Sequence, residues 1–198
     1  MDTIAVFGMY FGQLPSWIDN FVETCKYNPS VTWFLFVDGP APLNRSANVR
    51  VVHLTNQELG HRLKERLGVV GRITNGYKLC DLRPVFGELF ADYLGGFDFW
   101  GHCDLDVMWG SLRTFLTPQC LNDFDVISGD PGRLCGPFTT YRNEPLINSL
   151  YRRGAFEEVL ARDTNQPENG RSTVNLSPRR KVSSSGVLQG HPHERQAN

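Results

Sequence analysis

Two acidic residues one position apart could bind a cation together. Asp104 and Asp106 stand in the stretch GHCDLDVMWG, directly behind the apolar run FDFW. On an extended backbone, residues two apart point to the same face, so both carboxylates would face one way while Leu105 faces the core. Mg²⁺ and Mn²⁺ favour such oxygen ligands and complete their coordination with waters and substrate phosphates. The pair therefore predicts a site for a metal–nucleotide complex with Mn²⁺ or Mg²⁺.

The alternative is that the two aspartates only end a buried strand, because Asp is common at turns. The sequence on both sides is strongly apolar, with FDFWGHC before the pair and VMWG after it. Both carboxylates should therefore lie near a core, where like charges repel unless a cation or a proton offsets them. This context favours the metal site.

The elements that must position the pair alternate between short β-rich runs and helical patterns, which indicates an α/β fold with a mainly parallel sheet flanked by helices. Strands are expected over residues 3–10, 31–39, 48–54, 97–107 and 124–130, and a further strand leads into a helix within 135–160. Helices are expected over 14–29, 55–68 and 78–96, with a short one around 111–116. Ligands of open α/β sheets bind outside the carboxyl ends of the strands, where Asp104 and Asp106 would lie.

Three of these helices carry specific end or face signals. In the first, Trp17 falls at helical spacing among the residues of the apolar face, so we expect it to be buried. In the second, Thr55 and Glu58 form a capping box. In the third, Pro84 fits only the first turn of a helix, which would make Asp81 its N-cap.

Composition limits the classes of partner. The chain has 198 residues and a formal net charge of −1, so it suits one domain with a real core and offers no global field for nucleic acid or an anionic membrane. Its five cysteines form no CxxC pair, which is typical of reduced thiols in the cytoplasm. No leader pattern or apolar stretch of about 18 residues is present, so we expect a cytoplasmic protein that is at most peripheral to a membrane.

The composition changes near residue 162. Residues 163–198 contain no aromatic side chain and are rich in Ser, Asn, Pro, Gly and Arg. Such a segment cannot bury enough apolar surface to offset its chain entropy. We therefore expect one folded domain over residues 1–162 and a disordered or poorly ordered tail over 163–198.

A resemblance to a known family is carried by two stretches between Lys78 and Asn143, which read KLCDLRPVFGELFADYLGGFDFWGHCDLDVMWG and LCGPFTTYRNEP. They resemble a bacterial family of uncharacterised, polysaccharide-associated proteins with a GT-A-type, Rossmann-related glycosyltransferase fold. More loosely, the order of D-L-R and D-x-D resembles that of sugar transferases that bind a metal and a nucleotide-sugar diphosphate. The resemblance implies transfer from a nucleotide-sugar donor, above all a UDP-sugar, to a glycan or lipid-linked glycan acceptor in surface polysaccharide synthesis.

The resemblance also implies roles for single residues near the aspartates. Asp106 would be the direct metal ligand, and Asp104 would be shared between the metal and the donor ribose. Asp81 and Arg83 would face the donor nucleotide. Lys78 is a further cation that could approach the diphosphate, although Arg83 and Lys78 could equally be ordinary solvated helix residues.

Four residues at the ends of the first two strands are candidates for the donor pocket. By the resemblance, Phe7, Gly8 and Tyr10 would line the base pocket, and Asp38 would end the second strand nearby. The alternative for Phe7 and Tyr10 is a place in the core. Inversion at the sugar would also need a carboxylate base.

Asp130 and Glu144 are candidates for that base by location only, and Asp130 could instead be a turn residue. We interpret His102, beside the pair, as a core histidine rather than a metal ligand. His191 and His193, in the tail, would mimic a metal ligand only by chance in a flexible segment.

Two other functions remain open at this point. CDLDV also fits the D-x-D-x-[T/V] pattern of aspartyl-nucleophile (HAD-like) phosphatases, in which Asp104 would attack phosphorus and Asp106 would act as acid and base. That motif usually opens its domain, whereas here three strand units precede it. The third possibility is a truncated, non-catalytic protein that still binds nucleotide sugars, because the Ser/Arg-rich tail replaces the folded sequence that similar proteins continue with.

Overall fold

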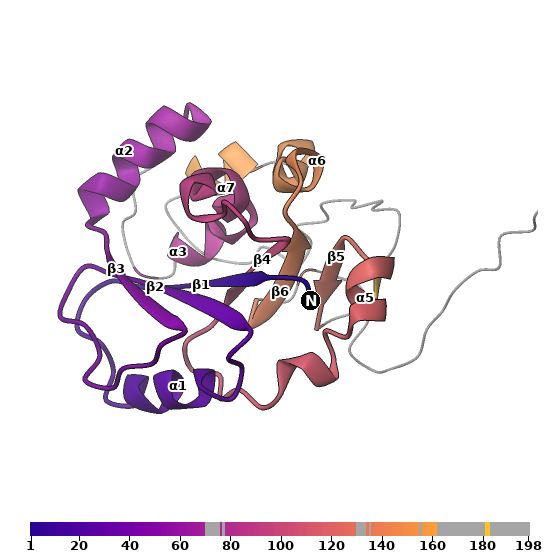
Figure 1. The fold of residues 1–198 in the computed structure, drawn as a ribbon. Coiled ribbons are helices and arrows are strands. Elements are labelled where there is room, and N and C mark those ends of the chain that lie inside the picture. Colours follow the sequence, from indigo (N-terminus) through magenta and orange to yellow (C-terminus); the bar gives the residue numbers. More distant parts are fainter. Residues whose placement is uncertain are drawn as a thin grey trace, which may run out of the picture.

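The computed structural model describes residues 1–69, 76, 78–129, 134, 136–154, 156–161 and 181–182. It contains one mixed sheet in the order β3-β2-β1-β4-β6-β5-β7, with helices against both faces (Figure 1). The strands are β1 Ile4–Tyr10, β2 Val31–Val37, β3 Val49–His53, β4 Phe99–Cys103, β5 Val126–Ser128, β6 Phe138–Arg142 and β7 Lys181–Val182. The prediction of an α/β fold with a mainly parallel sheet is confirmed.

One strand departs from the parallel arrangement. β1 to β4 run parallel, but β6 is antiparallel to both of its neighbours, β4 and β5. β7 pairs parallel with β5 and is formed by Lys181 and Val182. The rest of the expected tail over 163–198 lies outside the described residues, as do His191 and His193.

The helical elements lie in two layers. They are α1 Ile18–Cys25, α2 Asn56–Leu67, α3 Lys78–Asp81, η1 Arg83–Val85, α4 Phe86–Leu89, η2 Ala91–Tyr93, η3 Leu112–Thr114, α5 Pro118–Asp123, α6 Pro145–Asn148, η4 Leu150–Arg153 and α7 Phe156–Ala161. In Figure 1, α1 covers one face of the sheet, and α2, α3, α6 and α7 cover the other. Among the described residues, no helix is both long and apolar enough to cross a membrane.

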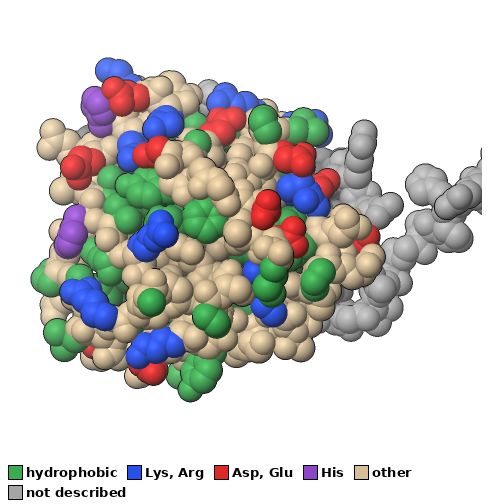
Figure 2. All heavy atoms as spheres, in the orientation of Figure 1, with side chains coloured by type: hydrophobic (Ala, Val, Ile, Leu, Met, Phe, Trp, Pro, Cys, Tyr) green, Lys and Arg blue, Asp and Glu red, His purple; other side chains and the backbone are tan. Residues whose placement is uncertain are grey.

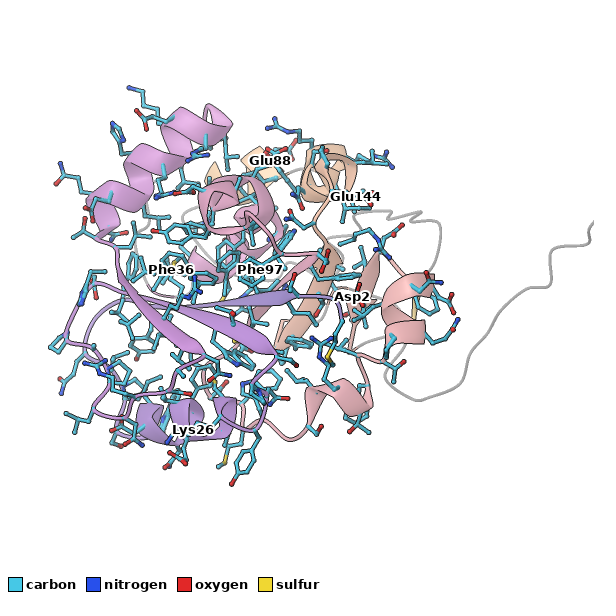
Figure 3. All side chains as sticks on the ribbon, viewed as in Figure 1. Asp2, Lys26, Phe36, Glu88, Phe97 and Glu144 are labelled. Carbon is cyan, nitrogen blue, oxygen red and sulfur yellow. The ribbon has the colours of Figure 1, made fainter. Side chains whose placement is uncertain are left out.

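The sheet separates two hydrophobic cores, which explains why β1 and β2 are apolar along almost their whole length. Phe7 and Phe36 belong to one core, in which the rings of Phe36 and Phe90 stack with centroids 4.3 Å apart. Figure 3 shows Phe36 on the side of the sheet that faces α2. On the other face, Trp33 packs against Phe21 of α1 in the second core. Both faces of β1 and β2 are thus buried.

The expected capping box is confirmed at the start of α2. The Thr55 hydroxyl accepts from the Glu58 N–H at 3.2 Å, and the Glu58 carboxylate accepts from the Thr55 N–H at 2.7 Å. Gly68 ends the helix with φ 71°, a left-handed conformation that suits glycine.

The expected single helix over 78–96 is wrong, because it is broken into α3, η1, α4 and η2. Pro84 lacks the N–H that an α-helix needs, and its ring would clash with the carbonyl of residue 80, so it lies in the 3-10 turn η1. Asp81 is therefore the last residue of α3 rather than the N-cap of a long helix. The break directs Arg83 toward the end of β4.

The topology places a crevice beside the aspartates. The chain runs from β1 outward through β2 and β3, then returns to the other side of β1 to form β4. Neighbouring parallel strands whose connections leave in opposite directions leave a crevice at their carboxyl ends, where α/β proteins bind ligands. In this fold that point lies between the ends of β1 and β4.

The visible surface offers no single-sign patch. Figure 2 shows Lys and Arg side chains interspersed with Asp and Glu over the face that it draws. On this face, mixed charges of this kind do not form an extended basic surface, which is what attracts nucleic-acid backbones.

Candidate functional site

A hollow of about 680 Å³ lies at the carboxyl ends of β1 and β4. Its wall is formed by the end of β1, the start of α1, the α3–η1 segment and the residues after β4. The lining residues are Met9, Tyr10, Phe11, Trp17, Gly76, Leu79, Cys80, Arg83, Cys103, Asp104, Leu105 and Asp106. We refer to this hollow as the switch-point pocket.

The two aspartates both line this pocket, although not on one continuous strand. β4 ends at Cys103, and Leu105 and Asp106 lie in a turn. The N–H of Asp104 donates to the carbonyl of Pro137 at 3.0 Å. Leu105 is 6% exposed and anchors the turn in the core, as expected, whereas Asp106 is exposed. The turn, rather than strand alternation, brings the pair to one pocket.

Arg83 is the cation of the switch-point pocket. Its Nη2 donates to Oδ1 of Asp104, and its Nη1 donates to the carbonyl of Gly136 at 2.9 Å. The Arg83 side chain is 17% exposed and that of Asp104 is 28% exposed, so the ion pair is partly desolvated. The guanidinium thereby offsets part of the repulsion between Asp104 and Asp106.

Aromatic side chains also line the pocket. Tyr10 and Phe11 are half-buried, and Trp17 is 38% exposed. The expectation that Trp17 is buried is wrong, because α1 begins at Ile18 and leaves Trp17 at the N-cap, facing the pocket. Sequence reasoning missed Trp17 and Phe11 as pocket residues. The only available signal was their place in the loop after the first strand, where α/β proteins bind ligands.

Phe7 and Gly8 do not line the pocket. Phe7 is fully buried among core aromatics, with ring centroids 5.5 Å from Phe90. Gly8 is also buried, and a Cβ atom there would lie 2.5 Å from Cδ2 of Leu105. The missing side chain of Gly8 is what allows Leu105 to seat the aspartate turn on β1.

Gly8→Ala should therefore displace the turn. We expect a loss of about 1–3 kcal/mol in stability from overpacking, together with weaker metal and nucleotide binding, measured by thermal unfolding and calorimetry. Adding Leu105→Val should restore part of both losses, because valine lacks the δ-methyl group that clashes. A Gly8→Ala protein with unchanged stability and binding would contradict this role of Leu105.

Lys78 and Asp81 are placed away from the pocket lining. Lys78 is 2% exposed, its Nζ lies 3.1 Å from Oδ2 of Asp81, and it donates to the carbonyl of Val159 at 2.8 Å. The pair thus joins α3 to α7 inside the domain. The alternative of a solvated Lys78 is wrong, because the side chain is buried.

Asp38 lines a second hollow of about 650 Å³. It is lined by residues 12–16, 18–19 and 38–43. Oδ1 of Asp38 accepts from the N–H of Gly12 at 2.6 Å, and Gly12 has φ 98°, which suits glycine. Asp38 thus holds the shape of the loop that follows β1 and lines this hollow.

Of the two proposed catalytic carboxylates, only Glu144 is among the described residues, and it is not brought to the aspartate pair. Asp130 lies outside the described residues. Because β6 is antiparallel to β4, Arg142 lies opposite Phe99, which is about 13 Å along the strand from Cys103. Glu144 follows two residues beyond Arg142, at the amino edge of β4. Figure 3 shows Glu144 beside α6.

His102 is a core residue. Its side chain is buried, and burial together with the positive charge of Arg83 lowers the pKa of His102 to about 3. The imidazole is therefore neutral near pH 7. This agrees with our interpretation of His102 as a core histidine.

Residues 6–169 match the family described as "Family of unknown function (DUF6625)". The chain belongs to this family. None of the curated proteins matches this chain.

Two solved structures are similar to this DUF6625 chain. One is the galactosyltransferase LgtC in complex with donor and acceptor sugar analogs, with 13% identity and a TM-score of 0.44, covering 79% of this chain and 62% of LgtC. The other is an active-site mutant of LgtC, with 13% identity and a TM-score of 0.43, covering 71% and 57%. The match thus spans about three fifths of the LgtC chains.

The two carboxylates of the pocket fit a divalent metal ion that takes most of its ligands from substrate phosphates and water. Within the described ranges there is no group of three or more His, Cys, Asp or Glu side chains that could hold a metal. Two carboxylates are nevertheless what Mg²⁺ commonly takes from a protein when substrate phosphates and waters supply the rest. Asp106 is exposed to the pocket, and Asp104 shares Oδ1 with Arg83.

Proposed function

We propose that this protein is a metal-dependent glycosyltransferase, which moves a sugar from a nucleotide-diphosphate donor to a glycan acceptor. The observation that carries the proposal is the grouping of Asp104, Asp106 and Arg83 in one pocket at the carboxyl ends of β1 and β4. Carboxylates for a cation and a guanidinium for phosphate are the groups that a metal–diphosphate ligand requires.

In this function each lining group has a task. Asp106 and Asp104 would hold Mn²⁺ or Mg²⁺, and Arg83 would donate hydrogen bonds to the diphosphate. The bound cation supplies charge neutralisation for the diphosphate as it leaves the sugar. Tyr10 and Trp17 offer ring faces against which a base or a sugar can stack.

The second hollow would extend the donor site. Asp38 lines it together with residues 12–16 of the loop that follows β1, and its carboxylate can accept a hydrogen bond from an imide N–H such as that of uracil. This favours a UDP-sugar as donor. The acceptor that we propose is a glycan or lipid-linked glycan of surface polysaccharide synthesis, handled in the cytoplasm or at the membrane surface.

The proposal is tested with a panel of UDP-sugars and Mn²⁺, by measuring release of UDP with and without mono- and disaccharide acceptors. Acceptor-stimulated release of UDP would support the transferase. Release of phosphate from p-nitrophenyl phosphate, with Asp104 needed for it, would instead support the aspartyl-nucleophile phosphatase. Metal-dependent binding of UDP without turnover of any donor would support the non-catalytic nucleotide-sugar-binding protein.

A further inference from the structure

The ion pair between Arg83 and Asp104 occupies a carboxylate oxygen that the proposed metal site would use. Oδ1 of Asp104 accepts from Nη2 of Arg83, while Nη1 of the same guanidinium donates to Gly136 at 2.9 Å. Both side chains are more than two thirds buried, so water screens the pair only in part. A cation at Asp104 and the guanidinium of Arg83 therefore compete for the same charge.

The surroundings allow Arg83 to be held without Asp104. Its position follows from η1, which is fixed by Pro84 and packed through the buried Val85. The carbonyl of Gly136 is a second acceptor that does not belong to the aspartate turn. The guanidinium has five N–H donors, so it can keep the Gly136 contact and still offer donors to an anion in the pocket.

We propose that Arg83 is an exchangeable internal counter-ion of Asp104, which makes binding of metal and of nucleotide diphosphate mutually dependent. Without ligand, Arg83 neutralises Asp104 and weakens binding of a metal alone. When a metal and a diphosphate enter together, Asp104 pairs with the metal and Arg83 pairs with the phosphates. This inference rests on the proposed function and adds that the metal binds more weakly alone than together with the nucleotide diphosphate.

The coupling has a definite sign. If the metal and the diphosphate both depend on separating Arg83 from Asp104, each ligand must strengthen the binding of the other by the same factor, because coupling free energies are reciprocal. If Arg83 and Asp104 stayed paired, the binding of metal and of UDP would depend on each other only through the direct contact between the two ligands. The proposal therefore predicts that Mn²⁺ binds weakly by itself and more tightly when UDP is present.

Arg83→Gln distinguishes an Arg83 that must leave Asp104 when the metal binds from one that only holds the site in place. Without the guanidinium, Asp104 is free for the metal, so Mn²⁺ alone should bind about 3- to 5-fold more tightly, the size of a partly exposed ion pair. UDP in saturating Mn²⁺ should bind about 10- to 100-fold more weakly, because a charge-assisted hydrogen bond to phosphate is lost. The two affinities thus change in opposite directions.

The test measures free Mn²⁺ by electron paramagnetic resonance and UDP by calorimetry, with wild type, Arg83→Gln, Arg83→Lys and Arg153→Gln. Arg153 is exposed on η4 and lines neither hollow, so its variant controls for net charge and should match wild type. Arg83→Lys keeps the charge without the forked contact and should fall between wild type and Arg83→Gln.

The outcomes are distinct. Opposite changes in Arg83→Gln, with a smaller coupling between Mn²⁺ and UDP, support the exchange. If both affinities fall, or if Mn²⁺ binding alone is unchanged, Arg83 is not a counter-ion that must be displaced, and the inference is wrong while the proposed function stands. If wild type binds no UDP in the presence of Mn²⁺, the proposed function and this inference are both overturned.

Discussion

Asp106→Asn should lower the affinity for UDP in the presence of Mn²⁺ by about 30- to 100-fold, measured by calorimetry. Asparagine keeps the shape of the side chain and removes the charge that attracts the cation. Because Asp106 is exposed in a turn, the substitution should leave the unfolding temperature unchanged. The residual binding of UDP should no longer depend on Mn²⁺.

Asp104→Asn should differ from Asp106→Asn in stability. It also removes a metal ligand, but it leaves the partly buried guanidinium of Arg83 without its carboxylate, which costs about 1–2 kcal/mol. Glu65→Gln, on the exposed side of α2, makes the same change in charge and should affect neither binding nor stability. If Asp106→Asn binds UDP and Mn²⁺ as wild type does, Asp106 is not a metal ligand.

Asp81→Ala should destabilise the protein by about 2–3 kcal/mol, read from denaturant or thermal unfolding. It removes the carboxylate that lies 3.1 Å from the ammonium of Lys78, a side chain that is only 2% exposed. Deleting one partner of a buried charge is costly. The 22% exposure of Asp81 and the contacts that Lys78 keeps, such as that to the carbonyl of Val159, hold the effect below that of a fully buried pair.

Lys78→Met should cost less than Asp81→Ala, about 1 kcal/mol, because it removes the buried charge itself and keeps most of the volume. Neither variant should change the affinity for UDP, since neither side chain lines the switch-point pocket. A larger loss of stability in Lys78→Met than in Asp81→Ala would contradict this account of the pair. A selective loss of UDP affinity would restore the donor role that the sequence resemblance implies.

The main elements of the fold could be predicted because the sequence carries local signals for them. The continuous apolar run of β2 indicates a strand that is covered on both faces, and Thr55 with Glu58 marks the start of α2. The direction of β6 could not be predicted. Alternation and turn residues do not state which way a strand enters the sheet, and this direction moves Glu144 to the edge opposite Asp104.

The candidate site was predictable in its centre and less so in its wall. Asp104 and Asp106 follow a buried strand, and the carboxyl ends of parallel strands bind ligands. Trp17 was assigned to a buried face because helical spacing does not reveal where α1 begins. For Phe7 the resemblance implied a place in the base pocket, and the alternative of a core residue is the one that the structure shows. Alternation separates the two faces of a strand, but it does not show which residue is the last to be buried.

The most direct test of the account is the binding of UDP to the wild-type protein, measured by calorimetry in Mn²⁺ and again in EDTA. The account predicts binding in Mn²⁺ that weakens at least about tenfold in EDTA, because the two carboxylates repel the diphosphate unless a cation lies between them. No binding of UDP in Mn²⁺, or the same affinity in EDTA, would contradict a metal–diphosphate site at Asp104 and Asp106.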